Sequence, residues 1–304
     1  MPFAVRCSFD WRLRSRALPL GPRTLIMGIL NVTPDSFSDG GQFLNPDAAL
    51  KRALSMLDEG ADLLDLGGES TRPNSLPITP ADEQTRVMPV LRAILAARPD
   101  AILSIDTWHA ETARLAVEAG AEIVNDVSGH LWDPDMSATC AKLGCGTVLM
   151  HTRGRPQEWR SLPPLSPTEV VPLVLGDLEV RAQAAFAAGI AREAIVLDPG
   201  FGFGKAFDEN YPLLAHLDAF QTLGFPILAG VSRKSFLTRT LATLVSSNSE
   251  VVVPAPPDPD PTTVANTAAI LAGAHLLRVH DVRPARQAAA IADRILLASG
   301  VSES

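Results

Sequence analysis

The stretch Met27-Gly-Ile-Leu-Asn-Val-Thr-Pro-Asp-Ser-Phe-Ser-Asp-Gly-Gly41 shows the unit from which the chain is built. The apolar run over residues 25–30 has the length and composition of a buried strand, and the chain becomes polar at Asn31. The polar loop that follows is too long for a tight turn, and its glycines allow conformations that other residues avoid. A helical pattern with an Asn-Pro start and a glycine end occupies residues 45–60. Strand, polar loop and helix then recur to the end of the chain.

Seven more apolar runs of strand length follow, and each precedes a polar loop and a helical pattern. Their ranges are 61–66, 101–105, 122–124, 146–150, 194–197, 226–229 and 276–279. Apolar strands joined by helices indicate a parallel sheet that is buried on both faces. Eight such units predict an α/β fold with a single closed (β/α)8 TIM barrel. A doubly wound open sheet is the alternative, but no Gly-x-Gly-x-x-Gly follows the first strand and no boundary of a second domain is visible.

The first 23 residues carry a different pattern, in which apolar residues alternate with mostly polar ones. The alternating residues are Phe3, Val5, Cys7, Phe9, Trp11 and Leu13. This period of two predicts a short β extension or hairpin over residues 1–23 that covers one end of the barrel, with the (β/α)8 domain over residues 24–304. The N-terminal arginines suggest an organelle presequence as the alternative, and the strict alternation favours the hairpin.

The acidic composition makes some classes of binding partner improbable. A net charge of −8 and a pI near 5.3 argue against a surface for nucleic acid or for anionic membranes. Cys7, Cys140 and Cys145 fit no metal spacing and predict free thiols in a reducing cytoplasm. No apolar run approaches a membrane span, and no signal-peptide core is present. The proline-rich residues 245–261 have no period and predict an exposed insertion.

Chemically versatile residues gather where the predicted strands end. They are Asn31, Asp65, Asp106, Asn125, Met150 with His151, Asp198, Lys234, and Arg278 with His280. Any one aspartate here could simply cap the next helix or close a turn. A barrel, however, brings all the strand ends to one face, so the carboxylates would lie beside Lys234 and Arg278. Desolvated acids near two cations are costly unless they bind something, so this ring predicts a site.

The glycine-rich segment Pro199-Gly-Phe-Gly-Phe-Gly-Lys205 lacks the full spacing of a phosphate-binding loop. Its glycines allow the backbone and Phe203 to approach a flat ligand, whereas Phe201 suits the core and a ligand equally well. Ser232 lies near the start of a helix whose N-terminus, together with Lys234, suits a carboxylate or phosphate. Ordinary capping of that helix also explains the hydroxyl.

Taken in order, several motifs resemble those of the dihydropteroate synthase family. They are residues 28–41, Asp65-Leu-Gly-Gly-Glu-Ser-Thr-Arg-Pro73, Ser104-Ile-Asp-Thr107, Asn125-Asp-Val-Ser-Gly129, Asp198-Pro-Gly-Phe-Gly-Phe-Gly-Lys205, Ser232-Arg-Lys-Ser235 and Arg278-Val-His-Asp281. The resemblance implies a (β/α)8 barrel, a homodimer, Mg2+ as cofactor and membership of a family that is a sulfonamide target. It also implies the step of folate biosynthesis that joins 4-aminobenzoate to 6-hydroxymethyl-7,8-dihydropterin pyrophosphate, with dihydropteroate and pyrophosphate as products.

The resemblance further implies a role for each matching residue. The catalytic residues would be Lys234, Asp106, Arg278 and Asp35. The pterin would contact Asp106, Asn125, Asp198, Lys234, Met150, Phe203 and Arg278. The pyrophosphate would contact Asn31, Thr71, Arg72, Arg278 and His280, with Asn31 also near Mg2+. The 4-aminobenzoate would contact Phe37, Thr71, Pro73 and Ser232.

Three other functions compete with this interpretation. A pterin-binding methyltransferase domain shares the barrel and the Asp-Asn-Asp pterin site, but it has no need for Phe37, the Thr71-Arg72-Pro73 loop and the Ser232-Arg-Lys234 cluster together. A Schiff-base aldolase would use Lys234 as its amine. A non-catalytic pterin-binding homologue would bind the same ligands without turnover.

Overall fold

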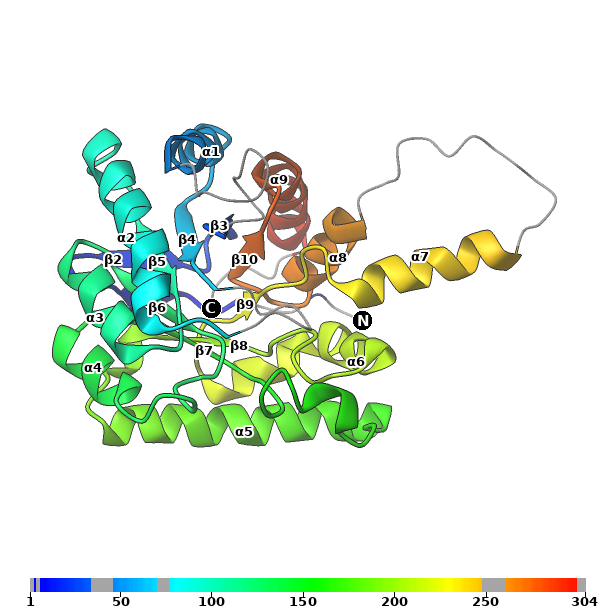
Figure 1. Ribbon diagram of the computed structural model, residues 1–304. Helices are drawn as coiled ribbons and strands as arrows, with labels where there is room; N and C mark the ends of the chain where they lie inside the picture. The colour runs from blue at the N-terminus through cyan, green and yellow to red at the C-terminus, as the bar shows by residue number, and fades with distance from the viewer. Residues whose placement is uncertain (1–2, 4–5, 34–45, 70–76, 248–260, 300–304) are drawn as a thin grey trace.

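The computed structural model describes residues 3, 6–33, 46–69, 77–247 and 261–299. Its main sheet has eight strands, all paired in parallel, and helices surround it (Figure 1). The strands are β3 (Leu25–Asn31), β4 (Leu63–Gly67), β5 (Leu103–Asp106), β6 (Ile123–Asp126), β7 (Gly146–Met150), β8 (Ile195–Asp198), β9 (Leu228–Ala229) and β10 (Leu276–Val279). Their order is β8-β7-β6-β5-β4-β3-β10-β9.

The two outer strands of this order also meet, so the sheet closes on itself. Leu197 of β8 forms a parallel bridge with Ile227, just before β9. The Leu197 amide also donates to the Pro226 carbonyl at 3.0 Å. The predicted (β/α)8 barrel is therefore confirmed, and the carboxyl ends of all eight strands share one face.

The helices follow the strands in the predicted alternation. They are α1 (Pro46–Asp58), α2 (Pro80–Ala97), α3 (Ala110–Glu118), α4 (Met136–Leu143), α5 (Pro167–Ala187), α6 (Asn210–Ala215), α7 (Ser235–Ser247), α8 (Pro261–Leu271) and α9 (Val282–Ala298). Short 3-10 turns cover Trp159–Ser161, Arg192–Ala194, Phe207–Glu209 and Leu217–Leu223. Local chemistry sets where helices begin, as where Thr79 accepts the Asp82 amide at 3.2 Å and Ser166 forms a capping box with Glu169.

Two boundaries differ from the prediction. One helical pattern is predicted after the strand at 194–197, but the helix there is divided, because His216 leaves the helical region with φ −122° and ψ 35°. The proline-rich insertion was expected to begin at residue 245, but α7 continues to Ser247. The rest of that stretch, residues 248–260, lies outside the described residues.

Apolar side chains form two core clusters. One lies between the strands and the helices that cover them, and includes Ile26 of β3 and Val87 of α2. The other combines inward-facing strand residues such as Met27 with Trp11, Leu13 and Leu20. These last three belong to an antiparallel hairpin and its turn, formed by β1 (Phe9–Arg12) and β2 (Ala17–Leu20).

The hairpin packs where the barrel strands begin. Trp11 is fully buried and its indole N–H donates to the Ala194 carbonyl at 3.0 Å, directly before β8. A Cβ atom on Gly146, the first residue of β7, would lie 2.8 Å from the Leu13 side chain, so the glycine lets the hairpin pack this closely without a shift of that side chain. The hairpin therefore fills the end of the barrel opposite to the strand-end residues. Among the described residues, no helix is both long and apolar enough to cross a membrane.

Replacing Trp11 by alanine is expected to destabilise the fold by about 3–5 kcal/mol, since it leaves a cavity and an unpaired carbonyl at Ala194. Chemical denaturation of the two proteins measures the difference. Val180→Ala is the matched control, because Val180 is 68% exposed on α5 and its loss should change stability by less than about 0.5 kcal/mol. A loss below about 1 kcal/mol for Trp11→Ala would show that the hairpin does not help to hold the barrel.

Candidate functional site

A charged cluster occupies the carboxyl ends of four strands. Arg278 of β10 donates Nε–H to Asp65 Oδ2 at 2.6 Å and an Nη2–H to Asp106 Oδ2 at 2.5 Å. Asn125 of β6 donates its amide N–H to Asp65 Oδ2 at 2.8 Å. The barrel thus brings together groups from β4, β5, β6 and β10. Asp65 Oδ1 is buried without a hydrogen-bond partner among the described residues.

Burial and charge act against each other at this cluster. Burial raises the pKa of Asp106 to about 7; Arg278 opposes the rise, and Asp65 and other acids add to it. Burial works to lower the pKa of Arg278, but Asp65 and Asp106 outweigh it and hold that pKa above its usual value. The guanidinium is therefore a permanent cation, whereas Asp106 can exchange a proton near neutral pH.

A second pair of opposite charges lies at the ends of β8 and β9. Asp198 ends β8, and its Oδ1 accepts the Gly200 amide N–H at 2.7 Å. Burial raises the pKa of Asp198 to about 6, against the pull of Lys234 and Arg278. Burial lowers the pKa of Lys234 to about 8, and the charge of Asp198 limits the fall. The pKa values of both groups are therefore shifted towards neutral pH, that of Asp198 upwards and that of Lys234 downwards.

The glycine-rich segment brings one of its two phenylalanines beside this pair. Lys234 Nζ lies over the Phe203 ring, 4.1 Å from its centroid. The Phe203 ring also meets Trp159 edge to face at 5.4 Å and stays partly exposed. Phe201, in contrast, is fully buried and stacks on Phe236 of α7, so its place is in the core. Phe203 is therefore the residue that is free to meet a ligand.

Ser232 and His280 form a hydrogen-bonded pair across β9 and β10. Ser232 Oγ lies 2.9 Å from His280 Nδ1 and also accepts the His280 amide N–H at 3.2 Å. Burial, together with the charges of Arg233 and Arg278, lowers the pKa of His280 to about 4, so the ring is neutral at pH 7. If the serine hydroxyl donates to Nδ1, Nε2 carries the ring hydrogen and can donate to an anion.

Asn31 ends β3 in register with Gly67 of β4. A Cβ atom at Gly67 would lie 3.7 Å from Asn31 Oδ1 and 3.5 Å from Asp106 Oδ2. The glycine thus leaves a space between an amide oxygen and a carboxylate oxygen that a single carbon would fill. Oxygen ligands of this kind suit Mg2+, which uses few protein ligands when phosphates supply the others. The described residues hold no cluster of three or more His, Cys, Asp or Glu side chains that could bind a metal alone.

Some strand-end residues do not join this cluster, and others lie outside the described residues. His151 follows β7 but is fully buried, with Nε2 3.0 Å from Asp177 and Nδ1 2.9 Å from Lys205. Met150 is buried and its carbonyl accepts an N–H of Arg181. The predicted site residues outside the described ranges are Asp35, Phe37, Thr71, Arg72 and Pro73.

Sequence reasoning missed a buried acid that borders the site. Glu83 of α2 accepts the Thr107 hydroxyl at 2.8 Å, next to Asp106 in the chain. Burial raises the pKa of Glu83 to about 7, and hydrogen bonds from Thr112 and Thr107 limit the rise. The sequence does not reveal that Glu83 is buried, because acidic residues are common in the first turn of a helix and normally lie in solvent.

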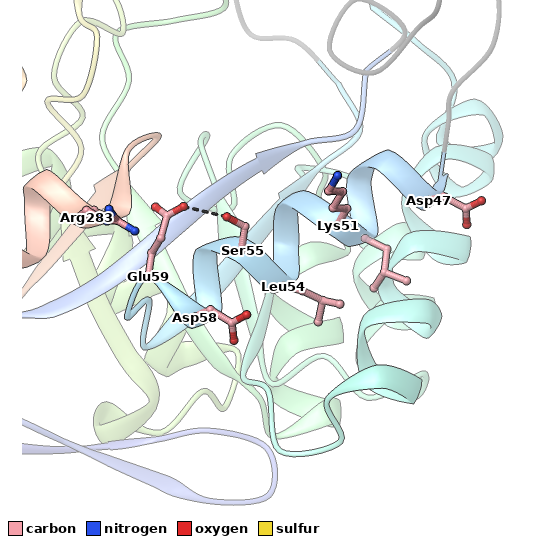
Figure 2. A pocket seen from close by; sticks show the side chains of 8 residues that line it. Asp47, Lys51, Leu54, Ser55, Asp58, Glu59 and Arg283 are labelled. Atoms are coloured by element: carbon pink, nitrogen blue, oxygen red, sulfur yellow. Dashed lines mark hydrogen bonds between the residues drawn. The ribbon is translucent and has the colours of Figure 1, made fainter.

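A surface depression of about 520 Å3 lies along helix α1 (Figure 2). It runs along α1 to the first turn of α9, and its lining residues are Asp47, Leu50, Lys51, Leu54, Ser55, Asp58, Glu59 and Arg283. Glu59 and Ser55 already bond to each other at 2.8 Å. None of the strand-end groups lines this depression, so the barrel mouth is the candidate site.

Comparison with known proteins identifies the family. The family model described as pterin binding enzyme matches residues 27–280. A dihydropteroate synthase of Clostridium beijerinckii is 40% identical over 285 residues, which cover 94% of this chain and 99% of the relative.

Solved structures agree in fold and sequence. The Xanthomonas albilineans dihydropteroate synthase, solved with 4-aminobenzoic acid, is 39% identical with a TM-score of 0.81, over 94% of this chain and 98% of that one. The Yersinia pestis dihydropteroate synthase, solved with a sulfonamide drug complex, is 37% identical with a TM-score of 0.82, over 95% and 100%. The chain therefore belongs to the pterin binding enzyme family and, within it, to the dihydropteroate synthases.

Proposed function

We propose that the chain condenses 6-hydroxymethyl-7,8-dihydropterin pyrophosphate with 4-aminobenzoate to give 7,8-dihydropteroate and pyrophosphate. The observation that carries the proposal is the ring of Asp106, Asn125 and Asp198 beside Arg278 and Lys234 at the barrel mouth. Acceptors next to permanent or tunable cations suit a polar heterocycle that bears an anionic leaving group. The relatives, named as enzymes of this reaction, favour synthase activity over methyl transfer.

The pterin site would use acceptors for the N–H edge of the ring and a donor for its opposite edge. Asn125 already donates to Asp65, which leaves its amide oxygen as an acceptor for a pterin N–H. Asp198 offers the oxygen that Gly200 does not use, and Asp106 completes the acceptor set. Lys234 would donate to the acceptor edge of the pterin. Met150 and Phe203 would line the slot, with Arg278 against the ring face.

The leaving group would bind at the outer rim of the same face. Asn31, Arg278 and the neutral His280 would contact the pyrophosphate, together with Thr71 and Arg72. The methylene C–O bond breaks and its electron pair leaves with pyrophosphate; the amine nitrogen of 4-aminobenzoate then bonds to the methylene and releases a proton. The cations stabilise the departing charge, so no covalent nucleophile is needed. Asp35 would assist catalysis from the first loop.

The second substrate would occupy the side of Ser232. This residue, with Phe37, Thr71 and Pro73, would form the 4-aminobenzoate site. Mg2+ fits the oxygen ligands beside Gly67, where Asn31 would hold it, and when bound it would neutralise charge on the pyrophosphate. We also propose sulfonamide inhibition, because the Yersinia pestis relative was solved with such a drug.

We propose two further properties of the protein in the cell. A cytoplasmic location is supported by the state of Cys7, Cys140 and Cys145, which are all free thiols. A homodimer is supported by apolar side chains that α8 and α9 expose to solvent, such as Val264 and Ile291. Light scattering of the purified chain would measure the dimer directly.

The test of the proposed function is direct. The protein is incubated with the pterin pyrophosphate, 4-aminobenzoate and Mg2+, and dihydropteroate is measured by chromatography. Formation of dihydropteroate in proportion to pyrophosphate supports the proposal. Ligand binding without product would mark a non-catalytic homologue, and activity that requires a corrinoid would mark a methyltransferase.

Binding is expected to be ordered, with 4-aminobenzoate second. Three of its four proposed contacts lie in the two long loops, and the second of these loops also supplies the proposed pyrophosphate residues Thr71 and Arg72, so a filled pyrophosphate site should favour its binding. Calorimetry should show little binding of 4-aminobenzoate to the free protein and clear binding once pyrophosphate and Mg2+ are present. Equal affinity in both conditions would contradict a binding site built by these loops.

A further inference from the structure

Lys205 is a buried lysine to which the roles above assign nothing. It closes the glycine-rich segment and is only 5% exposed. Its Nζ lies 2.9 Å from His151 Nδ1 and 3.3 Å from the Phe203 carbonyl oxygen. No ion pair joins it to a carboxylate within the described part of the chain. Burying an ammonium group that has only two neutral acceptors costs free energy, so a buried lysine at this position suggests a function.

The contacts of Lys205 run outward to the protein surface. Asp177 is a carboxylate that can only accept, because its contact with His151 holds its pKa below the usual value, so His151 Nε2 must carry the ring hydrogen and Nδ1 accepts from Lys205. That N–H points to Asp177 Oδ2 at 3.0 Å, on α5, where the carboxylate is 46% exposed. Burial lowers the pKa of His151 to about 3, which agrees with this neutral form. The direction of the Asp177–His151–Lys205 chain is therefore set, with the ammonium at its inner end.

At that inner end, Lys205 holds the backbone that carries Phe203. The Phe203 carbonyl accepts both Lys205 Nζ–H and the Arg153 amide N–H, the latter at 3.2 Å. Asn210 Oδ1 accepts the Gly202 amide at 2.7 Å, and the Asn210 amide N–H reaches the Lys205 carbonyl at 3.3 Å. These bonds fix the segment on both sides of Phe203. Its ring is thereby placed under Lys234 Nζ at 4.1 Å.

Lys205 also adds charge next to the pterin acceptors. The charged and titratable groups that face it are His151, Asp177, Arg181, Asp198, Lys234 and Arg153. Burial is the main reason that its pKa lies well below the usual value, and Arg181 adds to the fall. Asp198 opposes that fall, and Lys205 in turn is one of the cations that favour the ionised form of Asp198.

We propose that Lys205, held by the His151–Asp177 pair, is a positioning residue of the pterin site: it fixes Phe203 against Lys234 and supplies positive charge beside Asp198. The inference rests on the proposed function, because it assigns Phe203, Lys234 and Asp198 to the pterin. It predicts an effect that is specific for the pterin substrate. Of the proposed 4-aminobenzoate residues the structure describes Ser232, and within the described part of the chain Lys205 forms no hydrogen bond with it.

The test compares Lys205→Met with Lys205→Arg in the full chain. In Lys205→Met the KM for the pterin pyrophosphate should rise about tenfold or more, equal to about 1.4 kcal/mol, while the KM for 4-aminobenzoate stays within about twofold. Loss of a cation next to a carboxylate raises the pKa of that carboxylate, so the acid limb of kcat/KM should move to higher pH. Lys205→Arg should restore part of both effects. Lys142→Met on α4 is the matched control, since Lys142 is exposed.

An unchanged pterin KM, or an equal rise in both KM values with an unmoved acid limb, overturns the inference. Asp177→Asn covers the case in which Lys205→Met does not fold, because Asp177 is half exposed and asparagine can still accept from His151. This variant should raise only the pterin KM, by about two- to threefold, or about 0.4–0.7 kcal/mol. If the pterin KM is unchanged in this variant, the role proposed for the His151–Asp177 pair is wrong. A wild-type protein that makes no dihydropteroate would instead refute the proposed function, and pterin titration by calorimetry would then test Lys205 separately.

Discussion

Replacing Lys234 by alanine is expected to abolish measurable turnover. The lysine follows the seventh barrel strand, β9, and directly precedes α7; it lies over the Phe203 ring, and the charge of Asp198 acts on it, between the two proposed substrate sites. A charged hydrogen bond to the pterin is worth about 1.5–3 kcal/mol. Loss of one preorganised donor to developing charge typically costs a further 2.7–4 kcal/mol or so. Together these losses should lower kcat/KM by about three orders of magnitude or more.

The size of this effect must come from the site and not from unfolding. The ammonium is desolvated, and burial lowers the pKa of Lys234 to about 8, so its removal should cost the fold little. Turnover and thermal melting are therefore measured on Lys234→Ala and on the exposed Lys142→Ala, which should behave like the wild type. Wild-type rates in Lys234→Ala would remove this lysine from the mechanism. If borohydride and a carbonyl substrate instead trap Lys234, the aldolase alternative holds.

The barrel could be predicted from the sequence because the signals for its strands and helices are local and recur in each of the eight units. Runs such as 25–30 and 194–197 are apolar throughout, which is typical of a sheet buried on both faces, and helices with their own start and stop signals separate them. The parallel order then follows from the connections. Boundaries were less predictable, as α7 shows: it continues to Ser247, where the prediction placed an irregular insertion.

The site was predictable only as a set of strand ends. Topology alone implied that Asp106 and Arg278 would approach each other, and they do, although they are far apart in the sequence. The same rule placed His151 at the site, yet its ring turns to Asp177 and Lys205. Which way a residue at a strand end turns depends on its neighbours in space, and no periodicity carries that information.

The contacts of Asp198 determine how an asparagine at this position would be oriented. Asp198 Oδ1 accepts the Gly200 N–H at 2.7 Å. In asparagine the amide oxygen must keep this contact, because an NH2 group would face another donor there. The NH2 group then takes the position of Oδ2, on the side of Gly230, where a Cβ atom would lie 3.6 Å from that oxygen. The amide orientation is thus forced, and in the proposed pterin site a donor would face the N–H that the carboxylate was assigned to accept.

Pterin affinity of Asp198→Asn should therefore fall by one to several orders of magnitude. The lost charged hydrogen bond is worth about 1.5–3 kcal/mol and the opposed donors add a penalty of about 1–3 kcal/mol, at about 1.4 kcal/mol per factor of ten. Stability should behave differently. Because burial raises the pKa of Asp198 to about 6, the folded state loses stability as pH rises from the ordinary aspartate pKa through 6, and above this window the ionised carboxylate is a net cost.

Asparagine removes that cost, so at pH 8 the melting temperature of Asp198→Asn should equal or exceed that of the wild type. The measurement is paired: thermal melting without ligand, and titration of the pterin pyrophosphate by calorimetry at pH 8. Asp58→Asn on α1 is the control, because its side chain is 62% exposed and should change neither quantity. If Asp198 only closed the turn before Pro199, asparagine would keep that bond, and pterin affinity would stay intact. A lower melting temperature with intact affinity would show that Asp198 is structural and that the pterin binds elsewhere.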